Sequence, residues 1–503
     1  MNDAAGMSGL SSPEPAAAVN ASFGRAQGNA PMTSLIDGIP SLDTGSSEPI
    51  YRQIYERFRG AIAAGVLKPG DRIPSARALM VELGLARGTI EAAYSLLAAE
   101  GYVVARGQAG TVVAPGLKPR PAIELPAPRA SDSSMSTRFR PDTTLPFQMG
   151  LPALDAFPRK IWARLGARCI RAMQAVDMAL PPTAGLATLR AEIAAYLHVS
   201  RGIACAPEQV FVTSGYQHTV GLVGRALLDR GDRVWVENPG YPPAREILRL
   251  MGATPVAVPV DQDGIIVADG LRAAARARAA IVTPAHQSPL GVSLSLPRRQ
   301  ALLDWATRHE AWIVEDDYDG EYRYVSRPLP ALKSLDRDGR VLYAGTFSKV
   351  MFPSLRLAYL VVPEAQVARF EEVARSFAGA SPQLTQAILA AFISEGHFAR
   401  HIQRMRKLYA SRRKEAAAGL AAILGKHVRI DSQPGGMHLI LRLQGRRSDR
   451  RLVDRMTQAG LYGEALSDWT IGEHAASALL LGFTNIDSRH AAEGLARRLL
   501  ALL

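Results

Sequence analysis

The chain has 503 residues, of which 48% are hydrophobic and 21% are charged. It is too long for one ordinary domain and too apolar to be mostly disordered, so two or three domains are expected. It has no apolar run long enough to cross a membrane and no signal-peptide pattern, which predicts a cytoplasmic protein without a membrane segment.

The net charge is +13, from 59 Lys and Arg against 46 Asp and Glu. This excess indicates an anionic partner such as nucleic acid, although it says nothing about the fold. Part of the excess positive charge is concentrated in one stretch of the sequence. Seven basic side chains occur there without an acidic residue between them: Arg400, Arg404, Arg406, Lys407, Arg412, Arg413 and Lys414. This stretch fits a solvated helix face and a phosphate-contacting patch equally well.

The cysteines of the chain are Cys169 and Cys205. They are too few for a disulfide framework or for the ligand set of a structural zinc site. We therefore expect two buried, reduced thiols and no metal site.

Residues 1–47 are rich in Ala, Ser, Gly and Pro and show no apolar periodicity, which predicts a disordered extension. From residue 48 to residue 113 the pattern changes. Apolar residues recur at helical spacing, and turn signals separate three predicted helices at 49–65, 75–83 and 87–100. An alternating segment at 102–113 then predicts a hairpin. This order is typical of a winged helix-turn-helix domain, in which Ser75 caps the second helix and Gly84 ends it.

The third predicted helix would enter the major groove of DNA with its N-terminal residues leading. That orientation places Arg87 and Thr89 near base edges or phosphates, while Arg77 in the second helix and Arg106 in the hairpin would hold the DNA backbone. A small helical dimerisation module without DNA contact is the alternative.

Four sequence words follow one another in this domain: PIYRQIY at 49–55, LKPGDRIPSARAL at 67–79, GTIEAAY at 88–94 and LAAEGY at 97–102. With them the domain resembles the DNA-binding domains of the GntR family, and the resemblance implies operator DNA as a partner. The turn departs from the family pattern, because Ala86-Arg87-Gly88-Thr89 stands where Ser-Arg-Asn-Thr is usual. The missing Asn removes a side chain that can contact a base or a phosphate, and it leaves the operator preference open.

Residues 114–146 hold seven prolines and a Ser run, which predicts an extended, semi-rigid linker. In residues 147–503, short β-rich runs alternate with helical patterns. This alternation predicts an α/β domain built on a mostly parallel sheet that is covered on both faces. The runs lie at 210–213, 233–237, 280–283, 312–315, 341–344 and 359–362.

Lys349 follows one of these runs, in the segment TFSKVMFPSLR at 346–356. A lysine in this place, seven residues before Arg356, suits a Schiff base with a cofactor that also carries a phosphate. Arg356 would clamp that phosphate, and Thr346 and Ser348 can donate their hydroxyls. Pro353 would keep Lys349 on a loop.

Asp316 and Tyr318 lie where another run ends, in the segment VEDDY at 314–318. Ligands sit at the strand ends of parallel sheets, and a pyridoxal ring needs a carboxylate to keep its nitrogen protonated. We assign that carboxylate to Asp316 and a hydrogen bond to the cofactor's phenolic oxygen to Tyr318. Asp317 and Asp319 are expected to make structural or solvent contacts.

Further motifs stand at other strand ends. Ser214 and Gly215 precede a predicted helix that begins at Tyr216, whose free N–H groups would bind the same phosphate. Tyr241, in ENPGY, offers an aromatic ring to stack on the cofactor. The pair His286-Gln287 lies in the polar loop TPAHQSPLG at 283–291.

In this order the motifs make the region from residue 147 resemble the fold-type I aminotransferases, which bind pyridoxal 5'-phosphate. The resemblance implies that Lys349 forms the internal aldimine and that Asp316 pairs with the pyridinium. It also implies phenolate-side contacts from Tyr318, His286 and Gln287, stacking by Tyr241, and a phosphate cradle of Ser214, Gly215, Tyr216, Thr346, Ser348 and Arg356. The usual Pro-Thr-Gly reads Pro289-Leu290-Gly291, so one hydroxyl is missing near the substrate side.

Together the two modules resemble the MocR-type bacterial transcriptional regulators from about residue 48 to the end. The resemblance implies a homodimer joined head-to-tail through the large domain and associated with the nucleoid. It also implies aldimine chemistry, with pyridoxal phosphate or an amino compound as effector, that is coupled to operator binding. Two alternatives stay open: a working aminotransferase with a vestigial DNA-binding module, and a repressor that binds its operator regardless of cofactor.

Sustained transamination is not expected. In the aminotransferases that the domain resembles, a late strand carries an arginine that pairs with the substrate α-carboxylate, a few residues before an aromatic. The matching run here is Ala478–Phe483, with Leu480 in the place of that arginine. Leucine offers a carboxylate no charge-assisted pairing. Unless another arginine reaches in, the effector lacks an α-carboxylate or is pyridoxal phosphate itself.

Overall fold

The computed structural model describes residues 42, 46–107, 110–117, 144–324, 330–377, 381–431, 433, 435–472 and 476–503. The chain divides into two compact units, one ending at Ser134 and one beginning at Met135. The expected extension at 1–47 and the expected linker at 114–146 fall largely outside the described residues. In the described ranges no helix is long and apolar enough to cross a membrane.

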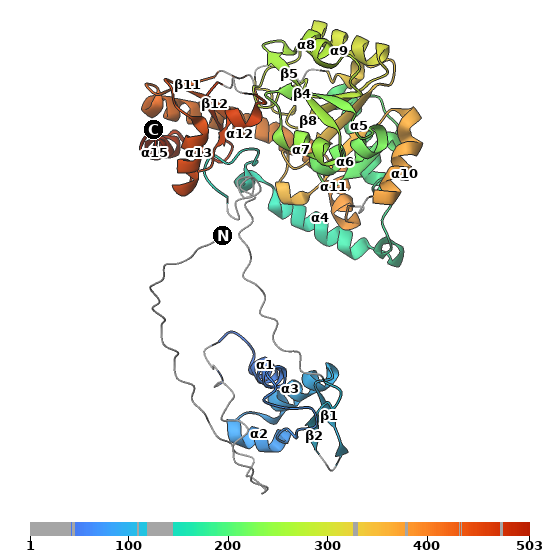
Figure 1. Ribbon diagram of the computed structural model, residues 1–503, viewed down its shortest axis with the longest axis vertical. Helices are drawn as coiled ribbons and strands as arrows, with labels where there is room; N and C mark the ends of the chain where they lie inside the picture. Colours follow the sequence, from blue (N-terminus) through green and yellow to red (C-terminus); the bar gives the residue numbers. More distant parts are fainter. Residues whose placement is uncertain are drawn as a thin grey trace, which may run out of the picture. The chain divides into compact units, whose positions relative to one another are not determined.

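The described part of the N-terminal unit contains three helices and a hairpin (Figure 1): α1 (Ile50–Ala63), α2 (Ala76–Leu83), α3 (Arg87–Ala99), β1 (Val103–Ala105) and β2 (Thr111–Val113). The two strands are antiparallel. The predicted helices and hairpin are therefore confirmed. The Ser75 hydroxyl accepts a hydrogen bond from the Ala78 amide at 3.1 Å and caps α2, and Gly84 ends this helix with a φ of +63°.

Helix α3 packs one face into the core of this unit and exposes the other. Its buried residues are Ile90, Ala93 and Leu97. The Phe58 and Tyr94 rings meet edge to face at 5.6 Å, and the Tyr94 hydroxyl donates to the Pro74 carbonyl at 2.8 Å. These contacts fix α3 against α1 and against the segment before α2. The first turn of α3 remains at the surface of the unit.

The large unit is built on an eight-stranded sheet of order β3-β10-β9-β8-β7-β4-β5-β6. Its strands are β3 (Val210–Thr213), β4 (Arg233–Asn238), β5 (Thr254–Asp261), β6 (Gly264–Ile265), β7 (Ala279–Val282), β8 (Trp312–Asp317), β9 (Val341–Thr346) and β10 (Ala358–Val361). Strands β5, β4, β7, β8 and β9 run parallel, whereas β10 is antiparallel to β3 and β9. The α/β class and the mostly parallel sheet are confirmed. The sequence did not predict β5, whose TPVAVPVD pattern is interrupted by prolines, or the short β6.

Helices cover both faces of this sheet (Figure 1). On one face lie α6 (Tyr216–Leu227), α7 (Pro242–Leu250) and α10 (Val367–Phe377), which pack on strand residues such as Val236 and Leu342. On the other face lie α5 (Ala187–Arg201), α8 (Val267–Ala274), α9 (Leu296–Arg308) and α11 (Gln383–Ser394), which pack on residues such as Ile313 and Tyr343.

A second sheet, antiparallel and of order β11-β12-β14-β13, forms the C-terminal lobe of the large unit (Figure 1). Its strands are β11 (Val428–Ile430), β12 (His438–Leu443), β13 (Glu464–Ala465) and β14 (Ala478–Gly482). The helices of the lobe are α12 (His397–Leu424), α13 (Asp449–Gln458), α14 (Leu466–Trp469) and α15 (Arg489–Leu500). The sequence predicted only the run that forms β14. Strands β11 and β13 are short, and β12 shows no alternating pattern.

The basic stretch at residues 400–414 lies on α12 and does not form one surface. Arg412 is buried, and its guanidinium pairs with the Asp155 carboxylate at 2.5 Å and donates to the Thr484 carbonyl at 2.6 Å. Arg406 donates to the Glu321 carbonyl at 2.5 Å. Both arginines therefore tie α12 to neighbouring segments, and the expectation of a single solvated face or phosphate patch is wrong for them.

Cys169 and Cys205 are free thiols, and both are half-buried. The expectation of full burial is wrong, because Cys169, a residue of α4 (Arg159–Ala172), and Cys205, in the loop that follows α5, both lie at the edge of the hydrophobic core.

A buried arginine anchors the end of β8. Arg201, the last residue of α5, pairs with Asp317 at 2.6 Å and with Glu321 at 2.9 Å, and all three residues are buried. The Tyr343 hydroxyl donates to Asp317 at 2.5 Å. Asp317 therefore makes the structural contacts expected of it, and this ion cluster fixes the strand end that carries Asp316.

Replacing Arg201 by alanine leaves two buried carboxylates without their cation. Removing one partner of a buried ion pair costs about 3–5 kcal/mol, so Arg201→Ala should lower the free energy of unfolding of the large unit by that amount. Arg249 pairs with Glu246 on the exposed surface at 3.7 Å and gives a matched control. Arg249→Ala should change stability by about 0–1 kcal/mol. Urea unfolding of the full chain measures both, and parent-like stability of Arg201→Ala would contradict the anchoring role.

Candidate DNA-binding surface and candidate cofactor cavity

The residues predicted to contact DNA lie on the N-terminal unit. Arg87 is the first residue of α3, and its side chain is 76% exposed and donates to Glu91 at 2.7 Å. Thr89 follows in the same turn and is half-buried. Arg77 is exposed in the first turn of α2, and Arg106 is exposed directly after β1. An arginine at the exposed start of such a helix can reach base edges in the major groove.

Arg72 is a further exposed cation of this unit, and no sequence motif indicated a role for it. Its backbone forms an isolated bridge with Val112 of β2. Its guanidinium lies against Gly110, where an added Cβ would come within 2.8 Å of Nε. Gly110 also has a φ of +81°, a backbone conformation that favours glycine. Arg72 precedes α2 and so lies outside the helix-turn-helix pattern that guided the prediction.

A cavity of about 310 Å³ in the large unit is lined by residues of both lobes. Of the twelve residues predicted to bind a cofactor, nine line it: Lys349, Asp316, Tyr318, Arg356, Gly215, Tyr216, Tyr241, Thr346 and Ser348. Asp316 and Thr346 lie at the ends of β8 and β9, and the other seven residues lie in the segments that follow β3, β4, β8 and β9. The cavity therefore lies where the strand ends of the sheet meet, as ligands do in α/β folds.

Lys349 lies in the turn after β9, and its Nζ donates to the Gly150 carbonyl at 3.1 Å. Gly150 has a φ of +64°, which favours glycine, and a Cβ there would come within 2.0 Å of Nζ, so a larger residue would force the lysine amine to move. Burial lowers the pKa of Lys349, and the charge of Glu464 opposes that change. A lowered pKa increases the fraction of neutral, nucleophilic amine.

Asp316, one residue before the end of β8, is buried. Burial raises its pKa well above the usual range, against a hydrogen bond from Tyr216 that lowers it. A cation beside the carboxylate would favour its charged form. Tyr318 follows on the same side, hydrogen-bonds Ser288, and has its hydroxyl 3.0 Å from His286 Nδ1.

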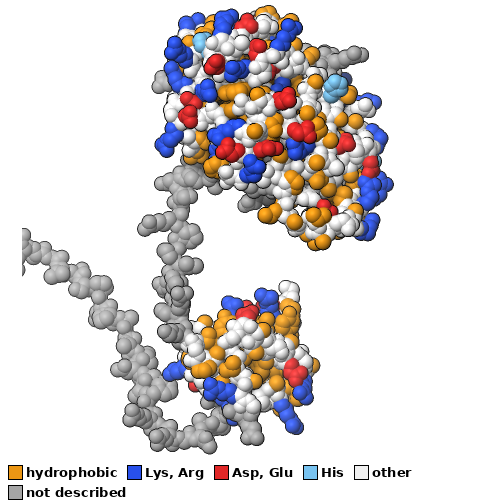
Figure 2. Space-filling model, turned by 90° about the vertical axis from the view of Figure 1, so that its right-hand side faces the viewer, with side chains coloured by type: hydrophobic (Ala, Val, Ile, Leu, Met, Phe, Trp, Pro, Cys, Tyr) orange, Lys and Arg blue, Asp and Glu red, His pale blue; other side chains and the backbone are white. Residues whose placement is uncertain are grey.

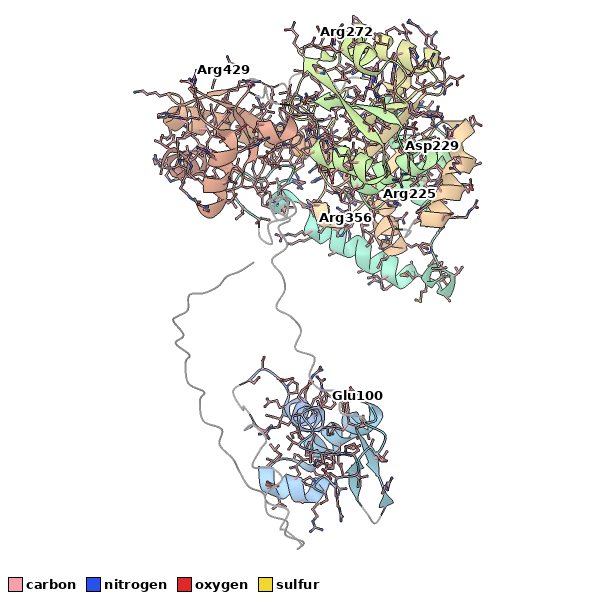
Figure 3. All side chains as sticks on the ribbon, viewed as in Figure 1. Glu100, Arg225, Asp229, Arg272, Arg356 and Arg429 are labelled. Carbon is pink, nitrogen blue, oxygen red and sulfur yellow. The ribbon has the colours of Figure 1, made fainter. Side chains whose placement is uncertain are left out.

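One side of the cavity is formed by the start of α6 and by Arg356. Gly215 has a φ of +128°, and an added Cβ would come within 3.1 Å of the Arg356 guanidinium, which therefore lies against the helix start. The first N–H groups of α6, from Tyr216 on, have no acceptor within the helix. Arg356, labelled in Figure 3, follows the 3-10 helix η7 (Pro353–Leu355) with a φ of +51°. Thr346 and Ser348 complete this side, where the Thr346 hydroxyl accepts from the Ser348 amide at 3.2 Å.

Ser214, His286 and Gln287 do not line the cavity, although the sequence placed them at the cofactor. The Ser214 hydroxyl lies 3.1 Å from a ring nitrogen of His218 within α6. Gln287 is buried, and its Nε2 donates to the Pro239 carbonyl at 2.9 Å. Both side chains therefore support the wall from behind.

His286 contacts the cavity through Tyr318. Its Nδ1 lies 3.0 Å from the Tyr318 hydroxyl and 3.1 Å from the Asp319 carboxylate. Asp319 thus makes the structural contact expected of it. Ser288, two residues further along the loop, takes the position in the wall beside Tyr318.

A second set of lining residues was not indicated by the sequence: Met149, Gly150, Gln217, Pro243, Ser288, Pro353, Met437, His438, Tyr462, Glu464 and Trp469. Several of them belong to the C-terminal lobe. The Tyr241 ring, predicted to stack on the cofactor, lies 5.6 Å from the Trp469 ring and 5.7 Å from the Tyr216 ring. Tyr462 and Trp469 precede β14 without a motif, so only the packing of the two lobes reveals them.

Comparison with known proteins identifies both units. Residues 50–113 match the family described as "Bacterial regulatory proteins, gntR family", and residues 156–471 match "Aminotransferase class I and II". The probable rhizopine catabolism regulatory protein MocR of Rhizobium meliloti is 39% identical over 464 residues, which cover 90% of this chain and 94% of that protein. The chain belongs to the MocR-type transcriptional regulators. The resemblance found in the sequence is thus confirmed.

A further MocR-type relative is the HTH-type pyridoxine biosynthesis transcriptional regulator PdxR of Corynebacterium glutamicum. It is 34% identical over 453 residues, which cover 89% of this chain and 94% of that protein. Both relatives carry names of regulators and match across both units. The DNA-binding regulator is therefore favoured over an aminotransferase with a vestigial DNA-binding module.

The large unit of this MocR-type regulator has the fold of the class I and II aminotransferases. It is similar to the α-aminoadipate aminotransferase of Thermus thermophilus, solved with N-(5'-phosphopyridoxyl)-L-leucine, with a TM-score of 0.65 and 30% identity over 71% of this chain and 92% of that one. An archaeal alanine:glyoxylate aminotransferase gives a TM-score of 0.66 at 25% identity, over 72% of this chain and 90% of that one.

Leu480, expected in the place of a carboxylate-binding arginine, is fully buried in β14. It belongs to an apolar cluster with Ile440 and Leu466, and it pairs with Glu464 of β13 across the antiparallel ladder. Leu480 does not line the cavity. Among the described residues that do, the positive charges are those of Lys349 and Arg356.

Arg87→Ala should weaken DNA binding by this regulator roughly 5- to 150-fold, because loss of a bidentate base contact costs about 1–3 kcal/mol. Glu91→Ala is the matched control, since it removes the ion-pair partner and leaves Arg87 in place, and it should not weaken binding. The probe is a duplex selected by the parent chain from a random pool, titrated by gel shift at one fixed salt concentration. Parent-like affinity of Arg87→Ala would show that base recognition lies elsewhere.

Proposed function

We propose that this MocR-type regulator binds pyridoxal 5'-phosphate in the cavity, senses a primary amine there, and changes its affinity for operator DNA in response. The observation that carries the proposal is the convergence of Lys349, Asp316 and Arg356 on one cavity. They supply an amine, a carboxylate and a guanidinium. These are the groups that an aldehyde, a pyridine nitrogen and a phosphate require.

The residues present fit this cofactor on two observations. Asp316 is a buried carboxylate with a raised pKa, and a pyridinium N–H beside it would favour the charged form. Glycines at positions 150 and 215 keep Cβ atoms away from the Lys349 amine and the Arg356 guanidinium. The free N–H groups at the start of α6 add an anion contact beside that guanidinium.

When bound, the cofactor supplies an aldehyde carbon to which primary amines add and a ring that accepts electron density. Lys349 is the resident amine, and burial favours its neutral form. Tyr318, which contacts Ser288 and His286, presents a fixed hydroxyl near Asp316. Tyr241 offers an aromatic face to the ring.

The contact between Lys349 and Gly150 is the route that we propose from the cavity to the DNA-binding unit. Gly150 follows the expected linker at 114–146 by a few residues. The segment between them is held by a hydrogen bond from the Gly482 amide to the Phe147 carbonyl at 2.8 Å. An amine that takes the place of Lys349 changes the partner of the Gly150 carbonyl. It alters DNA binding only if it binds one arrangement of the chain more tightly than the other.

A working aminotransferase is the second candidate function, because the cavity keeps the amine and the carboxylate that transamination uses. Repeated formation of a keto acid from an amino donor would support the enzyme. A stoichiometric spectral change that stops after one equivalent would support the sensor.

The purified chain should be yellow, and borohydride reduction should fix the cofactor on the peptide that contains Lys349. Lys349→Ala should lose this reducible adduct, because no other described lysine lines the cavity. Lys407, exposed on α12, gives the control: Lys407→Ala should keep the adduct. Peptide mass spectrometry reads out the position, and an unchanged adduct in Lys349→Ala would refute the assignment.

Exposed apolar side chains gather at the end of α4 and in the following 3-10 helix η4 (Ala175–Met178). Ile170 is 57% exposed, Val176 77%, Met178 73% and Leu180 97%. In Figure 2 hydrophobic side chains gather at the lower edge of the large unit, the edge along which α4 lies in Figure 1. Such patches mark interaction surfaces. This supports a homodimer joined through the large unit, whose two DNA-binding units serve paired half-sites. The head-to-tail arrangement rests on the resemblance to the MocR-type regulators.

The parent chain should therefore sediment as a dimer at micromolar concentration. The double variant Met178→Glu with Leu180→Glu puts two charges into the proposed interface and should raise the dimer dissociation constant by about tenfold or more. Leu296→Glu, at a 66% exposed residue that starts α9, is the control and should remain dimeric. A monomeric parent chain, or a double variant as dimeric as the parent, would contradict this interface.

A further inference from the structure

One charged side chain of the cavity has no part in the proposed cofactor binding. The charged residues of the described lining are Asp316, Lys349, Arg356 and Glu464. The first three bind the cofactor in the proposed function, and His438 is neutral near pH 7 because burial lowers its pKa to about 4. Glu464 of β13 remains, and it gives the C-terminal lobe an acidic group in the cavity wall.

Glu464 is held in a fixed orientation by two aromatic donors. Its Oε1 accepts a hydrogen bond from the Tyr462 hydroxyl at 2.7 Å, and its Oε2 accepts one from Trp469 Nε1 at 2.9 Å. A carboxylate offers about four lone-pair sites, so each oxygen keeps room for a further donor. Because Glu464 is half-buried and lines the cavity, that room is open to a ligand.

The surroundings of Glu464 favour a donor and disfavour a second carboxylate. Burial raises its pKa, while Tyr462, Trp469 and the charge of Lys349 act in the opposite direction. A hydroxyl or ammonium beside it would add to these stabilising contacts. The residue opposite in the β-ladder is Leu480, which is apolar and offers no charge.

A ligand carboxylate would compete with Glu464 for the cations of the described lining. Arg356 is committed to the cofactor phosphate in the proposed function, and Lys349, once an effector amine has taken its place, can pair with Glu464, whose charge already acts on it. The carboxylate would lie near Glu464, and like charges repel strongly in a cavity that is partly shielded from water.

We propose that Glu464 selects the effector, and that the effector is a primary amine whose second polar group is a hydrogen-bond donor, a hydroxyl or an ammonium, and not a carboxylate. This inference rests on the proposed function, because it takes Arg356 as engaged by the cofactor and Lys349 as the amine that the effector replaces. One amine of the effector takes the place of the Lys349 amine. The donor at its other end hydrogen-bonds the oxygens of Glu464.

A series of amines with one carbon skeleton tests the proposal: propylamine, propanolamine, diaminopropane and β-alanine. They end in a methyl group, a hydroxyl, an ammonium and a carboxylate. Each is titrated into the cofactor-loaded full chain, and the absorbance change gives an apparent dissociation constant. Diaminopropane should bind roughly tenfold more tightly than propylamine, since a charge-assisted hydrogen bond is gained. Propanolamine should also bind more tightly than propylamine, and β-alanine should be the weakest.

Glu464→Gln should abolish the advantage of diaminopropane and bring β-alanine level with propylamine or above it. Propanolamine should keep most of its advantage, because the amide oxygen still accepts a hydrogen bond. Whichever of diaminopropane and propanolamine binds the parent chain more tightly identifies the donor as ammonium or hydroxyl. Glu464→Asp keeps the charge, so β-alanine should remain the weakest ligand even if Glu464→Gln fails to fold. Glu208→Gln, the same change at an exposed residue outside the cavity lining, is the control.

A parent chain that binds β-alanine as tightly as diaminopropane would overturn the proposal, and so would a Glu464→Gln chain with parent-like ratios among the four amines. Borohydride labelling of Lys349 separates this failure from failure of the proposed function. A parent chain without cofactor absorbance and without label refutes the proposed function. A labelled parent chain without the predicted ranking refutes only the role of Glu464.

Discussion

The large unit depends on how β8 distributes three adjacent carboxylates. Successive side chains of a strand point to opposite faces, so Glu315 and Asp317 share one face and Asp316 has the other. Glu315 accepts hydrogen bonds from two backbone amides at 2.8 Å each, and Asp317 pairs with Arg201 at 2.6 Å. Since the fold itself supplies partners for these two carboxyl groups, Asp316 is the one that remains available to a ligand. The buried ion cluster and the cavity therefore lie on opposite faces of the same strand end.

The parallel order of β4, β7, β8 and β9 brings the segments that follow them to one edge of the sheet. Tyr241, Ser288 and Lys349 lie in those segments and Asp316 lies near the end of β8, although the four residues are far apart in the sequence. This half of the site could be predicted, because each motif is short, stands at a strand end and needs no more than the sheet to bring it into place. The winged helix-turn-helix could be predicted for a similar reason, since Ser75 and Gly84 mark the two ends of α2 by local geometry. Glu100, labelled in Figure 3, is the residue at which α3 ends.

The other half of the site depends on tertiary contacts that no local sequence pattern predicts. Glu464 and Trp469 come from the C-terminal lobe, and β13 is too short to show an alternating pattern. In the polar loop at 283–291 the sequence pointed to His286 and Gln287, but Gln287 bonds back to the Pro239 carbonyl and leaves the wall position to Ser288. The basic stretch on α12 was predicted wrongly for the same reason, because the burial of Arg412 against Asp155 depends on tertiary contacts that the sequence pattern does not show.

A sensor differs from an enzyme in what its binding energy must accomplish. A ligand that binds two arrangements of the chain equally well shifts nothing, however tightly it binds. In the proposed sensor the atom that would report on the cavity is Lys349 Nζ, which donates to the Gly150 carbonyl at 3.1 Å in this structure. Because Nζ occupies the space that a Cβ of residue 150 would fill, the lysine and the segment around Gly150 are packed against each other. Displacing Lys349 therefore removes both a hydrogen bond and a packing contact from the segment that leads toward the DNA-binding unit. The free-energy difference between the contacts that are lost and those that the bound amine restores sets how far the equilibrium between the two arrangements of the chain can shift.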